Sequence, residues 1–110
     1  MSFDLDSRID FYLNHLRVER QLAKNSVDAY SHDLRSFAQY AEKRKTGETA
    51  KIGEDLILSF LASLAEGGIN TRSITRYLVV LRGFFSFMTR EKIISKDPTS
   101  QIEFPGRWKK

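Results

Sequence analysis

Apolar side chains recur every three or four residues in four separate stretches of this chain, and no other feature restricts its fold as strongly. The stretches cover residues 4–20, 25–45, 54–65 and 71–91. Each one predicts a helix with an apolar face that must be buried against another element. No stretch alternates apolar and polar residues as a half-buried strand would. Since the connections are as short as helix–helix loops usually are, the sequence predicts an all-α fold, a compact bundle of four main helices.

The last stretch, residues 71–91, has the longest apolar stripe. At about 100° per residue, one face of the predicted helix carries seven apolar residues: Ile74, Tyr77, Leu78, Leu81, Phe84, Phe85 and Met88. The opposite face carries three arginines and one glycine: Arg72, Arg76, Gly83 and Arg90. Three polar residues flank that face: Thr75, Arg82 and Ser86. Because Val79, Val80 and Phe87 lie off the main stripe, we expect this helix to be buried on more than one side.

Capping residues indicate where the helices start and stop. Asn25 is a good N-cap for the second helix. Thr46-Gly47 is expected to end that helix, and Gly67-Gly68 is expected to end the third. Asn70 or Thr71 is expected to cap the fourth helix.

The composition excludes several classes of protein. The 110 residues suit one domain, and the lack of cysteine excludes a disulfide scaffold and a thiolate metal site. No apolar run reaches the roughly 18 residues that a membrane span needs. The first residues include acids instead of the basic and apolar segments of a signal peptide. We therefore expect a cytoplasmic protein without a membrane partner.

Groups that could perform catalysis or bind a metal are scattered. His15 and His32 lie on different predicted helices, and no pair of acids has metal-ligand spacing around them. Gly67-Gly68 lacks the neighbours of a phosphate-binding loop. Four tyrosines lack the neighbouring groups that activate a nucleophile: Tyr12, Tyr30, Tyr40 and Tyr77. The chain is therefore predicted to have no catalytic residue, no metal, no cofactor and no small-molecule substrate.

Positive charge is concentrated late in the chain. The net charge is +4, and residues 67–96 contain six basic residues and one acidic residue. Residues 52–66 contain three acidic residues and no basic one. The rigid guanidinium fork suits phosphate oxygens and guanine edges. The arginine face of the fourth helix therefore favours a nucleic acid as partner, with an ordinary solvated helix face as the alternative.

The start of the second helix is another candidate surface. Lys24-Asn25-Ser26 opens this helix, where backbone N–H groups and the helix dipole favour an anion such as phosphate, and an ordinary cap is the alternative. Eight residues are predicted to contact DNA: Lys24, Asn25, Ser26, Arg35, Arg72, Thr75, Arg76 and Arg82. Arg76 is the leading candidate. Arg82 lies at the edge of the apolar stripe, so its alternative role is to brace the bundle.

Two sequence runs resemble the Xer-type tyrosine recombinases and related phage integrases. Residues 22–34, LAKNSVDAYSHDL, are similar to the family pattern LA-x-NT-xx-AY-xx-DL. Residues 76–87, RYLVVLRGFFSF, are similar to R-x-LS-x-LR-x-FF-x-F. Asp97-Pro98, followed by Ile102 and Pro105, resembles the exit into the interdomain linker of that family. The resemblance covers nearly the whole chain with the same order and spacing.

The resemblance implies the core-binding, or SAM-like, domain of such a recombinase, whose second and fourth helices face DNA. Residues 1–95 would form this DNA-binding domain, and residues 96–110 would begin the linker to a catalytic domain. The catalytic residues of the family belong to that later domain, so this chain would not be an enzyme, although the whole recombinase would cut and rejoin DNA. The expected partners are double-stranded DNA and other recombinase protomers. The alternative function is a helical protein–protein interaction module that assembles protomers through its first helix.

Three residues depart from the family patterns. Ser26 stands where Thr is common, and it keeps the hydroxyl group. Val79 stands where Ser is common, which weakens any contact assigned to that position. Gly83 stands where a larger residue is usual, and it costs the helix about 1 kcal/mol relative to Ala.

Overall fold

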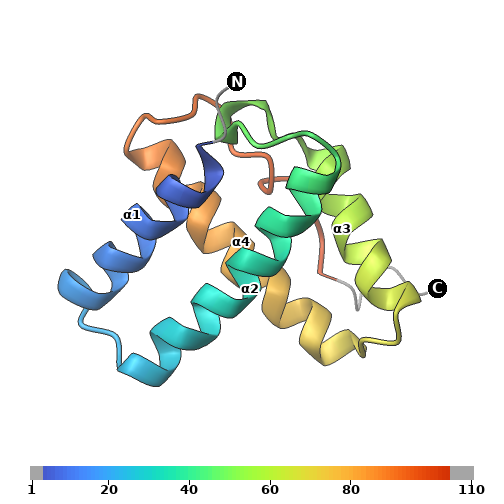
Figure 1. The fold of residues 1–110 in the computed structure, drawn as a ribbon, viewed down its shortest axis with the longest axis horizontal. Helices are drawn as coiled ribbons and strands as arrows, with labels where there is room; N and C mark the ends of the chain where they lie inside the picture. Colours follow the sequence, from blue (N-terminus) through green and yellow to red (C-terminus); the bar gives the residue numbers. More distant parts are fainter. Residues whose placement is uncertain (1–3, 105–110) are drawn as a thin grey trace. The chain divides into compact units, whose positions relative to one another are not determined.

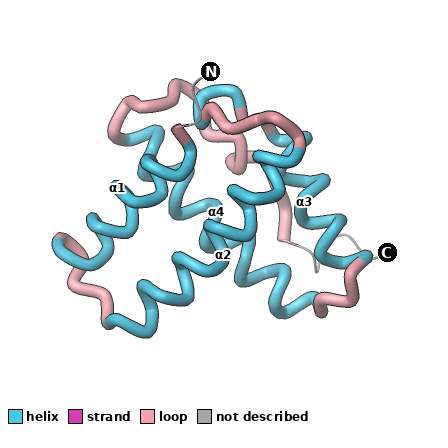
Figure 2. The backbone as a smooth tube through the Cα atoms, viewed as in Figure 1, coloured by secondary structure: helices cyan, strands magenta, loops and turns pink. Residues whose placement is uncertain are grey.

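The computed structural model describes residues 4–104. Within that range the chain forms four α-helices and one short 3-10 helix (Figure 1): α1 (Leu5–Val18), α2 (Lys24–Lys43), η1 (Thr49–Lys51), α3 (Glu54–Glu66) and α4 (Thr71–Arg90). Figure 2 shows no strand in this part of the chain. The predicted all-α class with four main helices is confirmed, and every helix end lies within two residues of its predicted place. The short helix η1 was not predicted.

The chain divides into two compact units, Met1–Lys51 and Ile52–Lys110, and each is described by itself. In the first unit α1 packs on α2, and in the second unit α3 packs on α4. This pairing of neighbouring helices follows from the short connections between them, because a short loop brings consecutive helices side by side.

Apolar stripes on both long helices form the core of the first unit. The predicted stripe of α1 is buried along its whole length: Leu5, Ile9, Tyr12, Leu13 and Leu16. Four apolar residues of α2 are buried as well: Leu34, Phe37, Ala38 and Ala41. The spacing of three and four residues in the sequence is therefore sufficient to identify the buried face of α1.

The second unit depends on α4, which buries nine side chains: Ile74, Tyr77, Leu78, Val80, Leu81, Phe84, Phe85, Phe87 and Met88. The ring of Tyr77 meets the ring of Phe60 from α3 edge-on, with centroids 5.8 Å apart. Val80 and Phe87 are buried beside the main stripe and widen the buried face to about half of the helix, so α4 is buried on one broad side and not on several. Val79 differs from these two residues, since 48% of it is exposed.

Helix starts follow the predicted caps in one of two cases. The Asn70 side-chain oxygen accepts a hydrogen bond from the Ser73 backbone N–H at 2.9 Å, so Asn70 caps α4 as predicted. The prediction that Asn25 caps α2 is wrong. Ala23 is the N-cap residue, because its backbone is extended and its carbonyl already accepts from the Val27 N–H at 3.0 Å. Asn25 therefore lies inside the first turn of α2.

The end of α2 also differs from the expected one. Lys45 has a φ of 60°, the left-handed conformation that usually favours glycine. The following Thr46 N–H donates to the Ala41 carbonyl at 2.9 Å, which closes the helix. Gly47 is buried instead, and its carbonyl accepts from the Leu5 N–H at 3.0 Å. The reversal of the chain thus occurs before Thr46-Gly47, whereas α3 is followed by left-handed Gly68 (φ 93°) as expected.

Asp4 joins the start of α1 to η1. The Thr49 backbone N–H and hydroxyl donate to Asp4 Oδ1 at 2.8 and 3.0 Å. Arg8 Nε lies 3.5 Å from the other carboxylate oxygen, Oδ2. Burial alone would raise the pKa of Asp4, but the hydrogen bonds from Thr49 and the positive charge of Arg8 outweigh it, so the pKa is lowered from its ordinary value.

Acid should weaken the first unit through Asp4. Because the pKa in the folded state is lower than in the unfolded chain, about 3.9, the stabilisation is fully present above that value and is lost as the pH falls through the folded-state pKa. We expect Asp4→Ala to lower the free energy of unfolding at neutral pH by about 1–2 kcal/mol, with a smaller difference in acid. Urea unfolding at a series of pH values measures both quantities.

Exposed Glu19 provides the control for this experiment, since it has no ion pair with the described part of the chain. Glu19→Ala should leave the pH dependence of unfolding close to that of the wild type. If the difference between wild type and Asp4→Ala stays constant from neutral pH to strong acid, the proposed charge interaction at Asp4 is wrong.

Candidate nucleic-acid interface

One side of α4 carries arginines, and the whole helix contains no acidic residue. The buried residues occupy one half of the helix, and at about 100° per residue the other half presents a line of six residues. We call this line the α4 row: Arg72, Arg76, Val79, Gly83, Ser86 and Arg90. The three arginines and Val79 are exposed, and Gly83 and Ser86 are partly exposed. The α4 row is therefore a cationic strip on a helix whose other half is buried.

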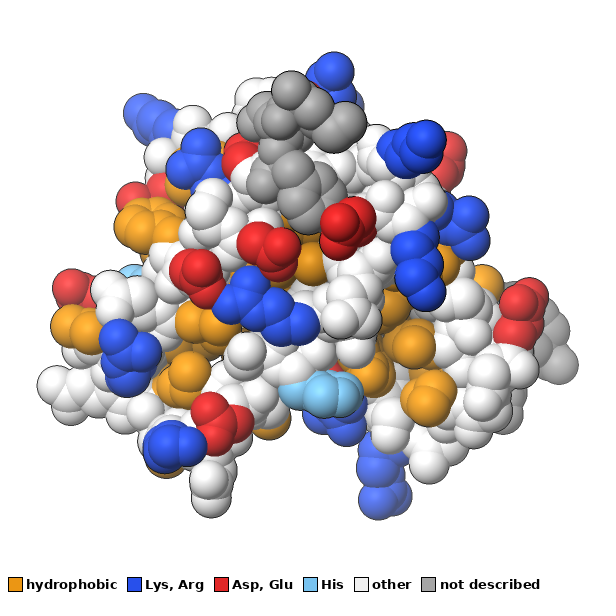
Figure 3. All heavy atoms as spheres, in the orientation of Figure 1, with side chains coloured by type: hydrophobic (Ala, Val, Ile, Leu, Met, Phe, Trp, Pro, Cys, Tyr) orange, Lys and Arg blue, Asp and Glu red, His pale blue; other side chains and the backbone are white. Residues whose placement is uncertain are grey.

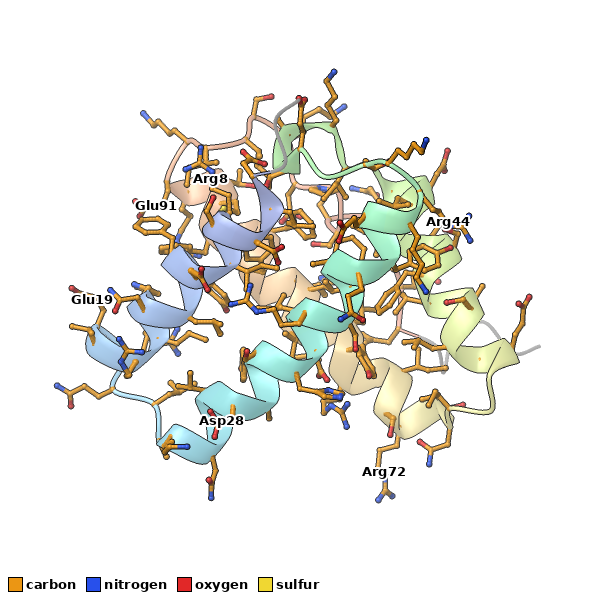
Figure 4. The ribbon with its side chains drawn as sticks, viewed as in Figure 1. Arg8, Glu19, Asp28, Arg44, Arg72 and Glu91 are labelled. Atoms are coloured by element: carbon orange, nitrogen blue, oxygen red, sulfur yellow. The ribbon has the colours of Figure 1, made fainter. Side chains whose placement is uncertain are left out.

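Arg72 and Arg76 lie one turn apart in the first part of this row. Figure 4 shows the side chain of Arg72 extending away from the α4 ribbon. Arg72 makes no ion pair with any residue in the range 4–104. The guanidinium of Arg76 lies over the ring of Tyr77, 4.9 Å from its centroid. A rise of about 1.5 Å per residue separates the two arginines by about 6 Å along the axis, close enough to engage neighbouring phosphates or one phosphate and a base.

The hydroxyl of Thr75 already has an acceptor. Thr75 Oγ1 donates to the Thr71 carbonyl at 2.9 Å, within the same helix. A bond from Thr75 to a phosphate would therefore have to replace this internal bond, because a hydroxyl has one proton to donate. Thr75 stays a prediction as a DNA contact, and it is a weaker one than Arg72 or Arg76.

Arg82 is turned toward the chain that follows α4. Its Nη1 donates to the Ile102 carbonyl at 2.8 Å, and its guanidinium lies 5.2 Å from the centroid of the Phe104 ring. This contact is the bracing role that the sequence left open for Arg82. The same side chain can reach DNA only if it gives up at least part of this bonding.

The segment from Asp97 to Phe104, which we call the exit segment, is held on the second unit. Asp97 Oδ1 accepts from the Thr99 N–H and hydroxyl at 2.9 and 2.6 Å. Thr99 and Ile102 are buried. The beginning of the predicted linker, residues 96–110, thus consists of turns packed on the protein, while Pro105 and the rest of that range lie outside the described residues.

The predicted contacts of α2 lie in its first turn. Lys24, Asn25 and Ser26 are all exposed. Ala23 has no side-chain acceptor to offer the first backbone N–H groups of the helix, which are the groups that a phosphate can bind. Lys24 Nζ lies 3.0 Å from Asp28 Oδ2, an exposed pair of the kind that contributes little to stability and exchanges readily.

Arg35 has acidic partners on the neighbouring helix. Its Nη1 lies 3.2 Å from Asp6 Oδ1, and its Nη2 pairs with Asp10 Oδ1. Figure 3 shows basic and acidic side chains intermixed on the face where α1 and α2 lie. Arg35 therefore joins α2 to α1, and its charge is balanced within the first unit. Its contact with DNA stays a prediction.

The structure thus separates the eight predicted residues into groups. It brings Arg72 and Arg76 together on the α4 row, and it brings Lys24, Asn25 and Ser26 together at the start of α2. Three further residues make internal bonds that a DNA contact would have to replace, namely Arg35, Thr75 and Arg82, while Lys24 pairs with Asp28 on the surface. Two exposed members of the α4 row, Val79 and Arg90, were missing from the predicted set, although the helical spacing placed Arg90 on the same face.

Other kinds of site lack support in the described residues. Between Asp4 and Phe104 no group of three or more His, Asp or Glu side chains could hold a metal ion. His32 Nδ1 lies 3.1 Å from buried Asp33 Oδ1, which is a pair and not a cluster. None of the helices in this range is long and apolar enough to cross a membrane.

Residues 9–92 match the protein family described as "Phage integrase, N-terminal SAM-like domain". The chain belongs to this family. The resemblance inferred from residues 22–34 and 76–87 is thereby confirmed, and the matched residues include α2, α3 and α4 in full.

Curated relatives of this SAM-like domain are named as tyrosine recombinases. Tyrosine recombinase XerD of Staphylococcus haemolyticus is 34% identical over 106 residues, which cover 96% of this chain and 36% of that protein. Tyrosine recombinase XerD of Pseudomonas aeruginosa is 39% identical over 97 residues, 88% of this chain and 32% of that protein. Tyrosine recombinase XerC of Roseiflexus sp. is 32% identical over 101 residues, with coverages of 92% and 32%. The chain spans about a third of the length of these relatives.

A solved structure shares the SAM-like fold. The crystal structure of the N-terminal domain of a phage integrase/site-specific recombinase from Haloarcula marismortui superposes with a TM-score of 0.80. The match covers 89% of this chain and 92% of that domain at 15% sequence identity. The helical arrangement is thus retained although most side chains differ.

Arg82 should hold the exit segment of this SAM-like domain. We expect Arg82→Ala to speed amide hydrogen exchange at Ile102 roughly tenfold or more, because a charged hydrogen bond is worth about 1.5–3 kcal/mol. Exchange in α4 should stay slow. Hydrogen exchange followed by NMR or mass spectrometry measures the effect.

Arg90→Ala is the matched control, since Arg90 bonds only to Ser86 of its own helix, at 3.2 Å, among the hydrogen bonds of the described residues. It removes the same charge from α4 and should leave exchange at Ile102 unchanged. Equal exchange rates at Ile102 in wild type and Arg82→Ala would refute the bracing role.

Proposed function

We propose that this chain is the DNA-binding domain of a site-specific tyrosine recombinase and that α2 and α4 bind duplex DNA at the recombination site. The observation that carries the proposal is the α4 row, in which Arg72, Arg76 and Arg90 are exposed on a helix without acids. Membership of the integrase N-terminal family and the names of the relatives support it. The first turn of α2, with Lys24, Asn25 and Ser26, is proposed as the second contact.

Phosphate contacts explain why arginines and a helix start would serve this function. Arginine offers several donors in a fixed plane that matches phosphate oxygens. The start of α2 offers backbone N–H groups and the positive end of the helix dipole. Such contacts position a duplex, whereas base contacts in a groove select its sequence. In this proposal Arg72 and Arg76 are long enough to make contacts of either kind.

The proposal assigns strand cleavage and rejoining to a different part of the recombinase. The chain covers about a third of its curated relatives, and no residue of it is proposed as catalytic. Residues 1–95 are proposed as the DNA-binding domain and residues 96–110 as the start of the linker to a catalytic domain. Double-stranded DNA as the partner and a cytoplasmic location belong to the same proposal.

Binding to duplex DNA should depend on salt and on the α4 row. Because counterions are released when phosphates are neutralised, affinity should fall steeply between 50 and 200 mM salt. Arg72→Ala and Arg76→Ala should each weaken binding roughly three- to tenfold and reduce the salt slope by about one. Fluorescence anisotropy with a labelled duplex of random sequence measures both.

Arg17→Ala serves as the control, since Arg17 is exposed on α1 and bonds to Asn14 Oδ1 at 2.8 Å. This variant loses the same charge outside the proposed surface and should bind almost as well as the wild type. If the two α4 variants behave like Arg17→Ala, general positive charge and not the α4 row would explain the binding.

The second candidate function is assembly of protomers through α1. Its support is the exposure of two large apolar residues on that helix, Phe11 at 45% and Val18 at 54%. Seven residues separate them, so they lie on nearly the same side of α1. An exposed apolar strip of this kind marks a surface that another protein can cover.

Self-association should then depend on Val18. We expect Val18→Glu to shift the chain toward monomers in sedimentation velocity experiments on duplex-bound protein, because the carboxylate would be buried at a protomer contact. DNA affinity of the single protomer should not change. Identical sedimentation of wild type and Val18→Glu would remove the support for this function.

A further inference from the structure

Val79 is an apolar side chain in the centre of a cationic row. It is 48% exposed, and it is the one large hydrophobic residue of α4 that is exposed. It follows Arg76 by three residues and precedes Gly83 by four, so the three lie on one side of the helix. The nine side chains buried on the other half of α4 prevent the helix from turning Val79 inward.

Any partner that meets the arginines of the α4 row also meets Val79. At about 1.5 Å per residue, Val79 stands about 4.5 Å along the axis from Arg76 and about 10 Å from Arg72. These separations correspond to between one and three base-pair steps of about 3.4 Å each. Gly83 adds no side chain on the next turn, so Val79 is the first apolar group that a surface approaching this part of the row would touch.

Among the base edges of the major groove, thymine offers an apolar group of matching size. The 5-methyl group of thymine projects into the major groove, where apolar side chains contact it. Valine suits such a contact because its branched Cβ keeps the side chain in few rotamers, so little entropy is lost on binding.

We infer that Val79 contacts the 5-methyl group of a thymine in the major groove and gives this chain a preference for thymine at one position of its target. The inference rests on the proposed function, since it requires the α4 row to face DNA. It adds a base-specific contact to a row that otherwise carries charge.

A protein partner fits Val79 less well. Protein-binding surfaces expose several apolar residues together, and α4 exposes one, flanked by Arg72 and Arg76. The flanking charges match a polyanion and would be costly to bury against an apolar surface. The residues of the α4 row therefore favour the groove of a DNA duplex over a protein surface as the partner of Val79.

The test compares thymine with uracil, which differ only in the 5-methyl group. The wild-type 110-residue chain first selects its preferred duplexes from a randomised pool. Each conserved thymine is then replaced by deoxyuridine in turn, and affinity is measured by anisotropy. One replacement should weaken wild-type binding roughly three- to fivefold, the value expected for one buried methyl group. Replacements at other positions should have little effect.

Val79→Ala provides the matched variant. Because Val79 is exposed, the variant should unfold at the same urea concentration as the wild type. It should bind the thymine and uracil duplexes with equal affinity, at the lower of the two wild-type values. Arg76→Ala should bind both duplexes more weakly and keep the difference between them.

The outcomes separate the two proposals. If the wild type binds, Arg76→Ala weakens binding and no uracil replacement matters, the inference about Val79 is wrong and the proposed function stands. If Val79→Ala keeps the full thymine preference, another residue reads the methyl group and the inference is also wrong. If the wild type binds no duplex at low salt, both the proposed function and this inference fail.

Discussion

The buried half of α4 fixes how this helix is rotated about its own axis, and the surface chemistry of the second unit depends on that rotation. Burying one large apolar side chain is worth about 1.5–3 kcal/mol, and nine side chains of α4 are buried. A rotation of α4 that exposed one arginine in place of another would change the free energy of folding by far less than the loss of this burial. The core therefore decides which residues reach the surface, and it places the α4 row there as a group.

The arginines of this chain have different roles although their side chains are identical. Arg35 lies beside two carboxylates, and Arg82 lies beside a backbone carbonyl and an aromatic ring, so both stabilise the fold. Arg72 projects from the start of α4, where the described residues offer it no acid. Net charge alone does not distinguish these cases. The distinction depends on which group lies within reach of the guanidinium: carboxylates balance the charge of Arg35, whereas no carboxylate among the described residues pairs with Arg72.

Local features of the sequence were sufficient to predict the helices and much of the buried face of α4. Periodicity and the Asn70 cap depend on residues within one or two turns of each other, so they can be identified without the fold. The partners of Arg35 and Arg82 could not be identified in this way, because they are 20 to 29 residues away. The exposure of Val79 was not predicted, although the same spacing of about 100° per residue places Val79 opposite the stripe, between Arg72 and Ser86.

Arg82 also links the flank of the α4 row to the exit segment. It follows Val79 by three residues and binds the Ile102 carbonyl, so the exit segment is attached at the flank of the row. A helix of 20 residues is about 30 Å long, and its hydrogen bonds make it move as one body. If the α4 row lies on DNA as proposed, the position of the duplex therefore determines where the exit segment lies. In the proposed function the same helix would bind the target and position the exit segment, so a brace such as Arg82 would contribute without touching DNA.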